Sequence, residues 1–273
     1  MNYDAVRQAA AVIAERTGRP EHRVAIVLGS GLASYAQSLP GAVEVPYADL
    51  PGFPLPKVEG HGGSLFSAQP GDVPVLCYSG RVHTYEGWDM DDVVFGVRTA
   101  VAAGCRTVIL TNAAGGAGDG LEPGDLVLLR DHLNLAARNP LVGTNDERLG
   151  PRFPDMSDTY PVDLRETARR VAADAGVTLK EGVYAWFLGP TFETPAEVQM
   201  AKRLGADLVG MSTVPEAIAA RHMGARILGI SLVTNLAAGI SPVPLSHEEV
   251  QETADEARER FTAVVDGLLR TLP

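Results

Sequence analysis

The stretch TVPEAIAARHMGARILGISLVTN, residues 213–235, holds one complete helix–glycine–strand unit. Thr213 and Glu216 have the spacing of a helix-capping pair, and Gly224 stands where that helix would end. The run Ile227–Val233 is apolar without alternation, which indicates a strand covered on both faces. A helix that leads through a short turn into a buried strand is the building unit of an α/β fold.

The same order recurs along the chain. Acceptor side chains begin, and glycines end, further helical runs at 89–104, 163–176 and 194–205, and a last helix is expected from Ser246 to about Leu269. Further apolar strand candidates are Val24–Leu28, Val73–Tyr78, Thr107–Leu110 and Leu208–Gly210. We therefore expect one α/β domain over residues 1–273, with a central, mixed but largely parallel sheet flanked by helices. The stretch Asn139–Tyr160, rich in Pro, Gly and Asp, is predicted to be an ordered insertion loop.

Composition disfavours several classes of protein. The 273 residues carry a formal net charge of −11, whereas binding to a nucleic-acid backbone needs clustered cations, so no nucleic-acid partner is expected. Neither a long apolar segment nor an export signal is found, so we expect no membrane association. Cys77 and Cys105 both lie in apolar runs, which fits a reducing cytoplasm. No ligand spacing typical of a zinc site occurs, so neither a metal nor another cofactor is expected.

Polar residues follow every predicted strand at its carboxyl end. They are Gly29-Ser30-Gly31, Arg81 with His83 and Tyr85, Asn112–Gly116, Met211-Ser212-Thr213, and Thr234-Asn235. Because ligands of open α/β sheets bind beyond the carboxyl ends of the strands, these clusters are expected to form one site.

Some of these residues suit an oxyanion. The glycine-rich stretches around Ser30 and Asn112–Gly116 can present backbone N–H groups, although such glycines often serve only tight turns. In SGRVHTYEGW, residues 79–88, alternation would place Arg81, His83 and Tyr85 on one side of an extended chain. Arginine binds phosphate with paired hydrogen bonds, and the alternative is a rim arginine beside a satisfied histidine. With Ser212 nearby, a dianion site is favoured; His61 is a weaker candidate, because a lone loop histidine is more often incidental.

Other residues suit a flat heterocycle. In GPTFETPAE, residues 189–197, Phe192 offers a ring for stacking and Glu193 a carboxylate, although a glutamate there could simply favour the helix dipole. Asn235 ends a buried strand, where its amide needs partners on both its donor and its acceptor side. Residue types alone thus indicate a phosphate, an aromatic heterocycle and a polar linker between them.

At this point the chain resembles the trimeric purine nucleoside phosphorylase family. Nine motifs occur in the order of that family and cover nearly the whole sequence: VLGSGL, VEGHGG, SGRVHTYEGW, TNAAGG, GPRFPDMSDTY, GPTFETPAE, VGMSTVPEAIAARHMG, SLVTN and SHEEV. The resemblance implies a phosphorylase/hydrolase-like fold, a homotrimer, and inorganic phosphate as co-substrate with no cofactor.

The resemblance also implies a role for individual residues. Phosphate would be held by Ser30, His61, Arg81, His83, the backbone of Ala113, and Ser212. The purine would contact Phe192, Glu193 and Asn235, and the ribose would contact Tyr85, Met211 and His247. Phe153, in the insertion loop, would close the pocket of a neighbouring subunit. Asn235, Glu193 and His83 are the residues expected to be catalytic, and a simple helix-start role for His247 stays open.

The implied reaction is reversible phosphorolysis of 6-oxopurine (deoxy)ribonucleosides such as inosine and guanosine. Family members for 6-oxopurines carry Asn where related methylthioadenosine phosphorylases carry Asp, and this chain has Asn235; His247 is polar where those relatives are apolar. A methylthioadenosine phosphorylase is therefore the disfavoured rival of the same class. A non-catalytic nucleoside- or phosphate-binding protein is the rival of another class, and a structural protein without a ligand would leave the polar strand ends unexplained.

Overall fold

The computed structural model describes residues 3–57 and 62–272. Its strands are β1 (Val24–Val27), β2 (Val43–Pro46), β3 (Ser64–Ala68), β4 (Val75–Tyr78), β5 (Thr107–Gly116), β6 (Leu126–Asn134), β7 (Leu179–Trp186), β8 (Leu208–Gly210) and β9 (Arg226–Leu236). Its α-helices are α1 (Tyr3–Thr17), α2 (Ser34–Ser38), α3 (Met90–Val93), α4 (Phe95–Ala102), α5 (Val162–Asp174), α6 (Pro195–Arg203), α7 (Val214–His222) and α8 (His247–Thr271). Two short 3₁₀ helices, η1 (Tyr47–Asp49) and η2 (Thr84–Glu86), complete the described elements.

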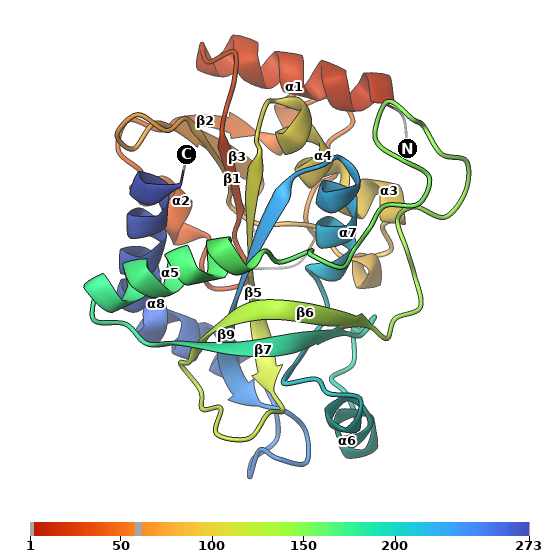
Figure 1. The fold of residues 1–273 in the computed structure, drawn as a ribbon, viewed down its shortest axis with the longest axis vertical. Coiled ribbons are helices and arrows are strands. Elements are labelled where there is room, and N and C mark those ends of the chain that lie inside the picture. The colour runs from red at the N-terminus through yellow and green to blue at the C-terminus, as the bar shows by residue number, and fades with distance from the viewer. Residues whose placement is uncertain (1–2, 58–61, 273) are drawn as a thin grey trace.

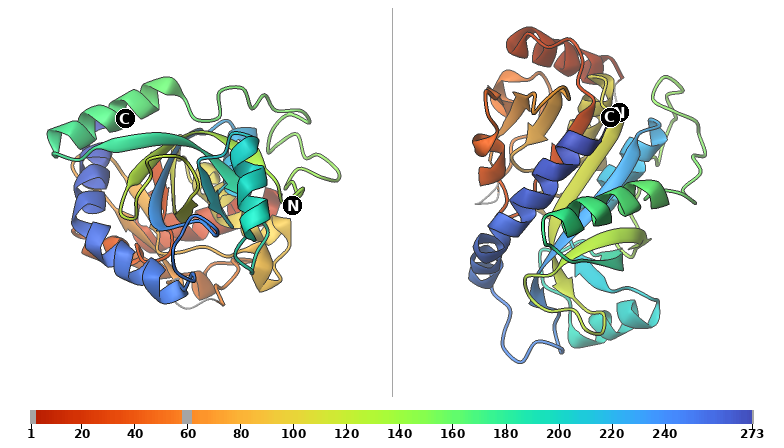
Figure 2. Two further views of the ribbon diagram at one scale, coloured as in Figure 1. Left: turned by 90° about the horizontal axis from the view of Figure 1, so that it is seen from below. Right: turned by 60° about the vertical axis from the view of Figure 1, so that its left-hand side comes forward.

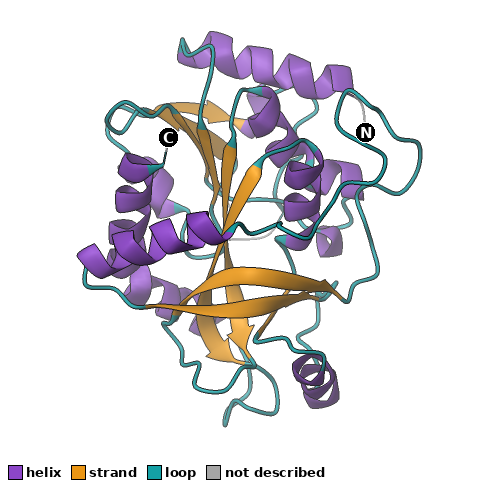
Figure 3. Cartoon of the chain, in the orientation of Figure 1, coloured by secondary structure: helices purple, strands orange, loops and turns teal. Residues whose placement is uncertain are grey.

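The described strands form one mixed sheet in the order β2-β3-β4-β1-β5-β8-β7-β6-β9, and β9 also pairs with β5. Because β9 returns to β5, the second half of the sheet closes on itself as a small ring. Strands β6 and β7 cross in front of the long strands β5 and β9 in the lower half of the molecule (Figures 1 and 3). The predicted α/β fold with a mixed sheet and flanking helices is confirmed, while the closure into a ring was not foreseen.

Both faces of β1 and β4 in the open half of the sheet are buried, as the apolar runs predicted. Ala25 and Val27 of β1 belong to a core beneath α1, α4 and α7, whereas Val24 and Ile26 belong to a second core beneath α2, α5 and α8. The helices accordingly surround the strands (Figure 2). Such two-sided cover is why these strands carry no polar alternation.

Several predicted boundaries were wrong for physical reasons. The run 89–104 is two helices, α3 and α4, because the backbone leaves the helical region at Val94 (φ −100°, ψ 2°). Helix α5 begins at Val162 after Pro161, so Asp163 lies in its first turn rather than before it. Thr194 and Glu197 do form the capping box of α6, and Ser246 accepts from the backbone N–H of Glu249 at the start of α8.

The stretch Asn112–Gly116 is not a loop but the end of β5, paired with β9 throughout. The predicted insertion loop joins β6 to α5 without a helix or strand of its own among the described residues. Its chain is held by side-chain hydrogen bonds, such as Arg152 Nη1 to Leu141 O at 3.0 Å. Within the two described ranges, no helix is long and apolar enough to cross a bilayer.

Candidate active site

One cavity of about 290 Å³ lies where β1, β4, β5, β8 and β9 end. Ten of the thirteen residues predicted for the site line this cavity: Ser30, Arg81, His83, Tyr85, Ala113, Phe192, Glu193, Met211, Ser212 and Asn235. The cavity thus joins the anion half and the heterocycle half of the predicted site, which come from segments far apart in the sequence. No cluster of side chains suited to a metal ion occurs in the part of the chain that is described.

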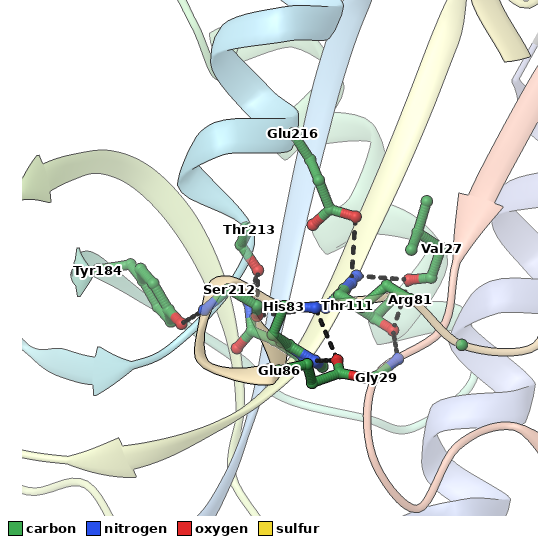
Figure 4. A network of polar contacts seen from close by, with 12 residues as sticks. Val27, Gly29, Arg81, His83, Glu86, Thr111, Tyr184, Ser212, Thr213 and Glu216 are labelled. Atoms are coloured by element: carbon green, nitrogen blue, oxygen red, sulfur yellow. Dashed lines mark hydrogen bonds and ion pairs between the residues drawn. The ribbon is translucent and has the colours of Figure 1, made fainter. Parts of the chain in front are cut away.

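Arg81 is fixed from several directions. Its Nε donates to Oε1 of Glu216 at 3.1 Å, and the two side chains are only 4% and 3% exposed. Nη1 donates to Ser212 Oγ at 3.3 Å, and Nη2 donates to the carbonyl of Val27 at 3.2 Å. Figure 4 shows the guanidinium held between the end of β1 and the first turn of α7. Arg81 is therefore a preorganised interior cation and not a rim side chain.

His83 is oriented by Glu86. One carboxylate oxygen, Oε1, accepts from the backbone N–H of His83 at 2.7 Å and lies 2.8 Å from Nδ1 of its ring. The other oxygen accepts from the backbone N–H of Lys57 at 2.6 Å. Because a carboxylate only accepts, Nδ1 carries the proton. Burial opposes the charge of Glu86, but the hydrogen bonds from His83 and Lys57 outweigh it, and the pKa of Glu86 lies below its usual value.

Tyr85 reaches the same cavity by a route that alternation did not predict. The chain turns into the 3₁₀ helix η2 at Thr84, so residues 81–85 are not one extended segment. The rings of His83 and Tyr85 stack with their centroids 4.6 Å apart. The prediction that Arg81, His83 and Tyr85 face one site agrees with the cavity lining, but its geometric reason was wrong.

Glu193 has an uncommitted carboxylate oxygen. The residue is 8% exposed, and its Oε1 has no hydrogen-bond partner among the described residues. Burial raises the pKa of this carboxyl. Thr194 and Glu197 already satisfy the start of α6, so capping that helix does not account for Glu193. A buried acceptor that faces a cavity is suited to an N–H donor on a ligand.

Asn235 lies next to a local irregularity in the sheet. Ala114 pairs with Val233 and Gly115 pairs with Asn235, so Thr234 is an extra residue in β9. The Thr234 hydroxyl donates to Asn235 Oδ1 at 3.0 Å, and Asn235 Nδ2 donates to the carbonyl of Leu236 at 3.0 Å. These bonds fix which end of the amide accepts and which end donates, and so they fix the direction of the Nδ2 hydrogens.

The described lining of the cavity tests neither His61 nor His247 and does not include Phe153. His61 lies outside the described residues, and His247 begins α8 with a side chain that is likewise not described. Phe153 is 88% exposed on the insertion loop. A role of Phe153 in a neighbouring subunit stays a prediction.

Sequence reasoning missed the residues that support the site. Glu216 was assigned to a helix cap with Thr213, but no side-chain cap forms there and Glu216 binds Arg81 instead. Tyr184 accepts from the backbone N–H of Ser212 at 3.3 Å, and burial raises its pKa to about 12. Only Glu86 had a local signal, since it follows His83 by three residues, the spacing of a capping pair.

Comparison with known proteins agrees with this geometry. Residues 23–270 match the family model described as the phosphorylase superfamily. The chain belongs to this family. It is 46% identical, over 100% of its length and 99% of the relative's, to purine nucleoside phosphorylase 1 of Geobacillus stearothermophilus. It is 51% identical to the purine nucleoside phosphorylase of Mycobacterium tuberculosis, over 96% of its own length and 94% of the relative's.

Solved structures give the same result. The purine nucleoside phosphorylase of Schistosoma mansoni in complex with inosine superposes with a TM-score of 0.93 at 36% identity, covering 100% of this chain and 98% of the other. A complex of that enzyme with adenosine matches equally well, with a TM-score of 0.93. The predicted family and the prediction of an enzyme are both confirmed.

Proposed function

We propose that this chain is a purine nucleoside phosphorylase that cleaves 6-oxopurine (deoxy)ribonucleosides, such as inosine and guanosine, reversibly with phosphate. The products are the free base and (deoxy)ribose 1-phosphate, and no cofactor takes part. The observation that carries the proposal is the single cavity that has buried Arg81 at its anion half and the buried acceptor of Glu193 at its heterocycle half. The names of the relatives support it.

In the proposed mechanism, Ser30, His61, Arg81, His83, the backbone of Ala113, and Ser212 hold phosphate. A phosphate oxygen bonds to C1′ while the glycosidic bond breaks, and the bonding electrons leave with the purine. Glu193 accepts the N1–H of the base and so holds it in position, and Asn235 Nδ2 donates to N7, which stabilises the departing anion. Tyr85, Met211 and His247 position the ribose, with Phe153 of a neighbouring copy closing the pocket.

The preference for 6-oxopurines rests on the donor and acceptor pattern. An ionised Glu193 accepts from N1–H, which 6-oxopurines carry and adenine lacks, and Asn235 Nδ2 suits N7. Because the Schistosoma enzyme was solved with both inosine and adenosine, binding alone does not separate these substrates. The ratio of kcat/KM values for inosine and adenosine is the relevant measurement.

The proposal includes a cytoplasmic homotrimer. The assembly of several copies is supported by the insertion loop, on which Val142 and Phe153 are 84% and 88% exposed. Apolar side chains presented in this way suit a contact with another copy of the chain.

The deciding experiment mixes the protein with inosine, with and without inorganic phosphate, and follows hypoxanthine. Release that depends on phosphate, with formation of ribose 1-phosphate, is expected. Release that ignores phosphate would indicate a hydrolase instead. Consumption of methylthioadenosine but not of inosine would indicate the related phosphorylase, and tight nucleoside binding without product would indicate a binding protein.

A further inference from the structure

Thr213 occupies a strained backbone position directly beside the phosphate half of the site. Its φ is +70° and its ψ is −49°, and the N–H of Val214 donates to the carbonyl of Ser212 at 2.7 Å. These values define a γ-turn with positive φ at its centre, a rare and strained conformation. A β-branched residue is especially unfavourable there, and glycine would be easier to accommodate. A threonine at such a position is therefore expected to have a function that depends on its side chain.

That side chain lies in a short chain of hydrogen bonds. Nδ2 of Asn112 donates to Thr213 Oγ1 at 2.9 Å, and Thr213 Oγ1 lies 3.1 Å from Ser212 Oγ. Arg81 Nη1 donates to Ser212 Oγ at 3.3 Å. Asn112 and Ser212 line the cavity, whereas Thr213 is 1% exposed.

The direction of the bond between the two hydroxyls follows from counting donors and acceptors. With Asn112 presenting Nδ2 to Thr213, a bond from Ser212 to Thr213 would leave the buried Thr213 proton without an acceptor in the described part of the chain, which is costly. If Thr213 donates to Ser212, its proton is used and Ser212 Oγ accepts from both Thr213 and Arg81. The hydroxyl proton of Ser212 is then left to point into the cavity. Donors aligned in one direction also polarise one another.

We propose that Thr213 is a positioning residue for phosphate: it donates to Ser212 Oγ and thereby keeps the Ser212 O–H aimed at an oxyanion in the cavity. This inference rests on the proposed function, since it concerns the co-substrate of that same site. The strained γ-turn brings the two hydroxyls of consecutive residues within hydrogen-bonding distance. Removing the Thr213 hydroxyl frees Ser212 to rotate, so the site loses most of one charge-assisted hydrogen bond.

The test compares two variants that remove the hydroxyl with one that keeps it. Thr213→Val preserves the shape, Thr213→Gly suits the positive φ, and Thr213→Ser retains the donor. Both hydroxyl-free variants are expected to raise the phosphate KM about tenfold, as for a hydrogen bond to a charged group. The KM for inosine should stay within about twofold of wild type, and Thr213→Ser should keep the phosphate KM within about threefold. Calorimetric titration with inorganic phosphate should give the same ranking.

A control and a double-mutant cycle separate positioning from packing. Thr99→Val removes a hydroxyl that is buried in α4 and has no partner among the described residues, so it should change neither KM. In a Ser212→Ala background, Thr213→Val should have less than about a twofold further effect on phosphate. A full further loss in that background, or an unchanged phosphate KM in Thr213→Gly, would overturn the proposal. If Thr213→Val does not fold, the glycine variant decides.

The inference and the proposed function can fail separately. Wild-type protein that releases no hypoxanthine with phosphate would refute the function. Calorimetry with inorganic phosphate would still test Thr213, and equal phosphate affinity in wild type and Thr213→Gly would refute the inference alone.

Discussion

Replacing Glu216 by glutamine should move stability and phosphate affinity in opposite directions. The variant keeps an oxygen that can accept from Arg81 Nε, at 3.1 Å in the native pair, but it removes the negative charge. Both side chains are almost fully buried, at 4% and 3% exposure. An uncompensated buried guanidinium typically costs about 3–5 kcal/mol. Because glutamine retains the hydrogen bond, we expect about 3 kcal/mol, the lower end of that range.

The effect on phosphate has the other sign. Glu216 contacts the guanidinium of Arg81, and a phosphate bound as proposed would contact the same group, so the two negative charges would repel each other across it. At an effective dielectric constant of about 20, two unit charges about 7 Å apart interact by about 2 kcal/mol. Removing the carboxylate should therefore strengthen phosphate binding roughly thirtyfold, because the phosphate becomes the counter-ion of Arg81.

Scanning calorimetry with and without phosphate, and titration with inorganic phosphate, measure the two effects. The melting temperature of Glu216→Gln should fall by about 6–10 °C without phosphate and recover in part when phosphate is added. Glu181→Gln is the matched control, because Glu181 is a partly exposed carboxylate paired with Arg165. That control should cost at most about 1 kcal/mol and leave phosphate binding unchanged. Weaker phosphate binding in Glu216→Gln would refute the reasoning, since it would show that the carboxylate serves the site only by holding Arg81 in place.

Further results are expected from the heterocycle half of the site, two for Asn235 and two for Glu193. Asn235→Ala should lower kcat/KM for inosine about a hundredfold or more, because it removes a donor to the leaving group; steady-state rates within a few-fold of wild type would reject that role. Asn235→Asp should shift the ratio of kcat/KM values towards adenosine, because it supplies an acceptor for a 6-amino group, and an unchanged ratio would show that Asn235 does not set the preference for 6-oxopurines. Burial raises the pKa of Glu193, so its carboxylate is lost on acidification at a higher pH than an ordinary glutamate, and inosine cleavage should decline there. The same burial makes the charged form of Glu193 unfavourable in the folded protein at neutral pH, so Glu193→Gln should raise the melting temperature while lowering activity. If the pH profiles of kcat/KM for wild type and Glu193→Gln had the same acid limb, the decline in activity could not be assigned to Glu193.

The sequence predicted the ends of the strands better than it predicted the residues that hold the site's side chains in place. A buried strand reveals itself by its own residues, so β1, β4 and β9 were found together with the polar residues that follow them. Glu216 is different, because its partner Arg81 lies 135 residues away. Its local spacing from Thr213 is equally typical of a helix cap, and only the tertiary structure decides between the two interpretations.

The end of β5 shows a second limit. Small residues in Asn112–Gly116 predicted a turn, yet the segment continues as a strand. A Cβ atom on Gly115 would lie 3.0 Å from Val209, and one on Gly116 would lie 3.0 Å from Val233. The glycines therefore allow the close approach of β8 and β9, which no local pattern reports.

This continuation of β5 has a consequence for catalysis. In its first half β5 pairs with β1, whose end approaches Arg81 through the Val27 carbonyl. In its second half it pairs with β9 at Asn235. The end of β1 beside Arg81 and the end of β9 at Asn235 are thus both paired with the same strand, so backbone hydrogen bonds set the separation of these two strand ends. Phosphorolysis needs the nucleophile and the leaving group on opposite sides of one sugar carbon, and a rigid spacer between their binding groups supplies that alignment before the substrates bind.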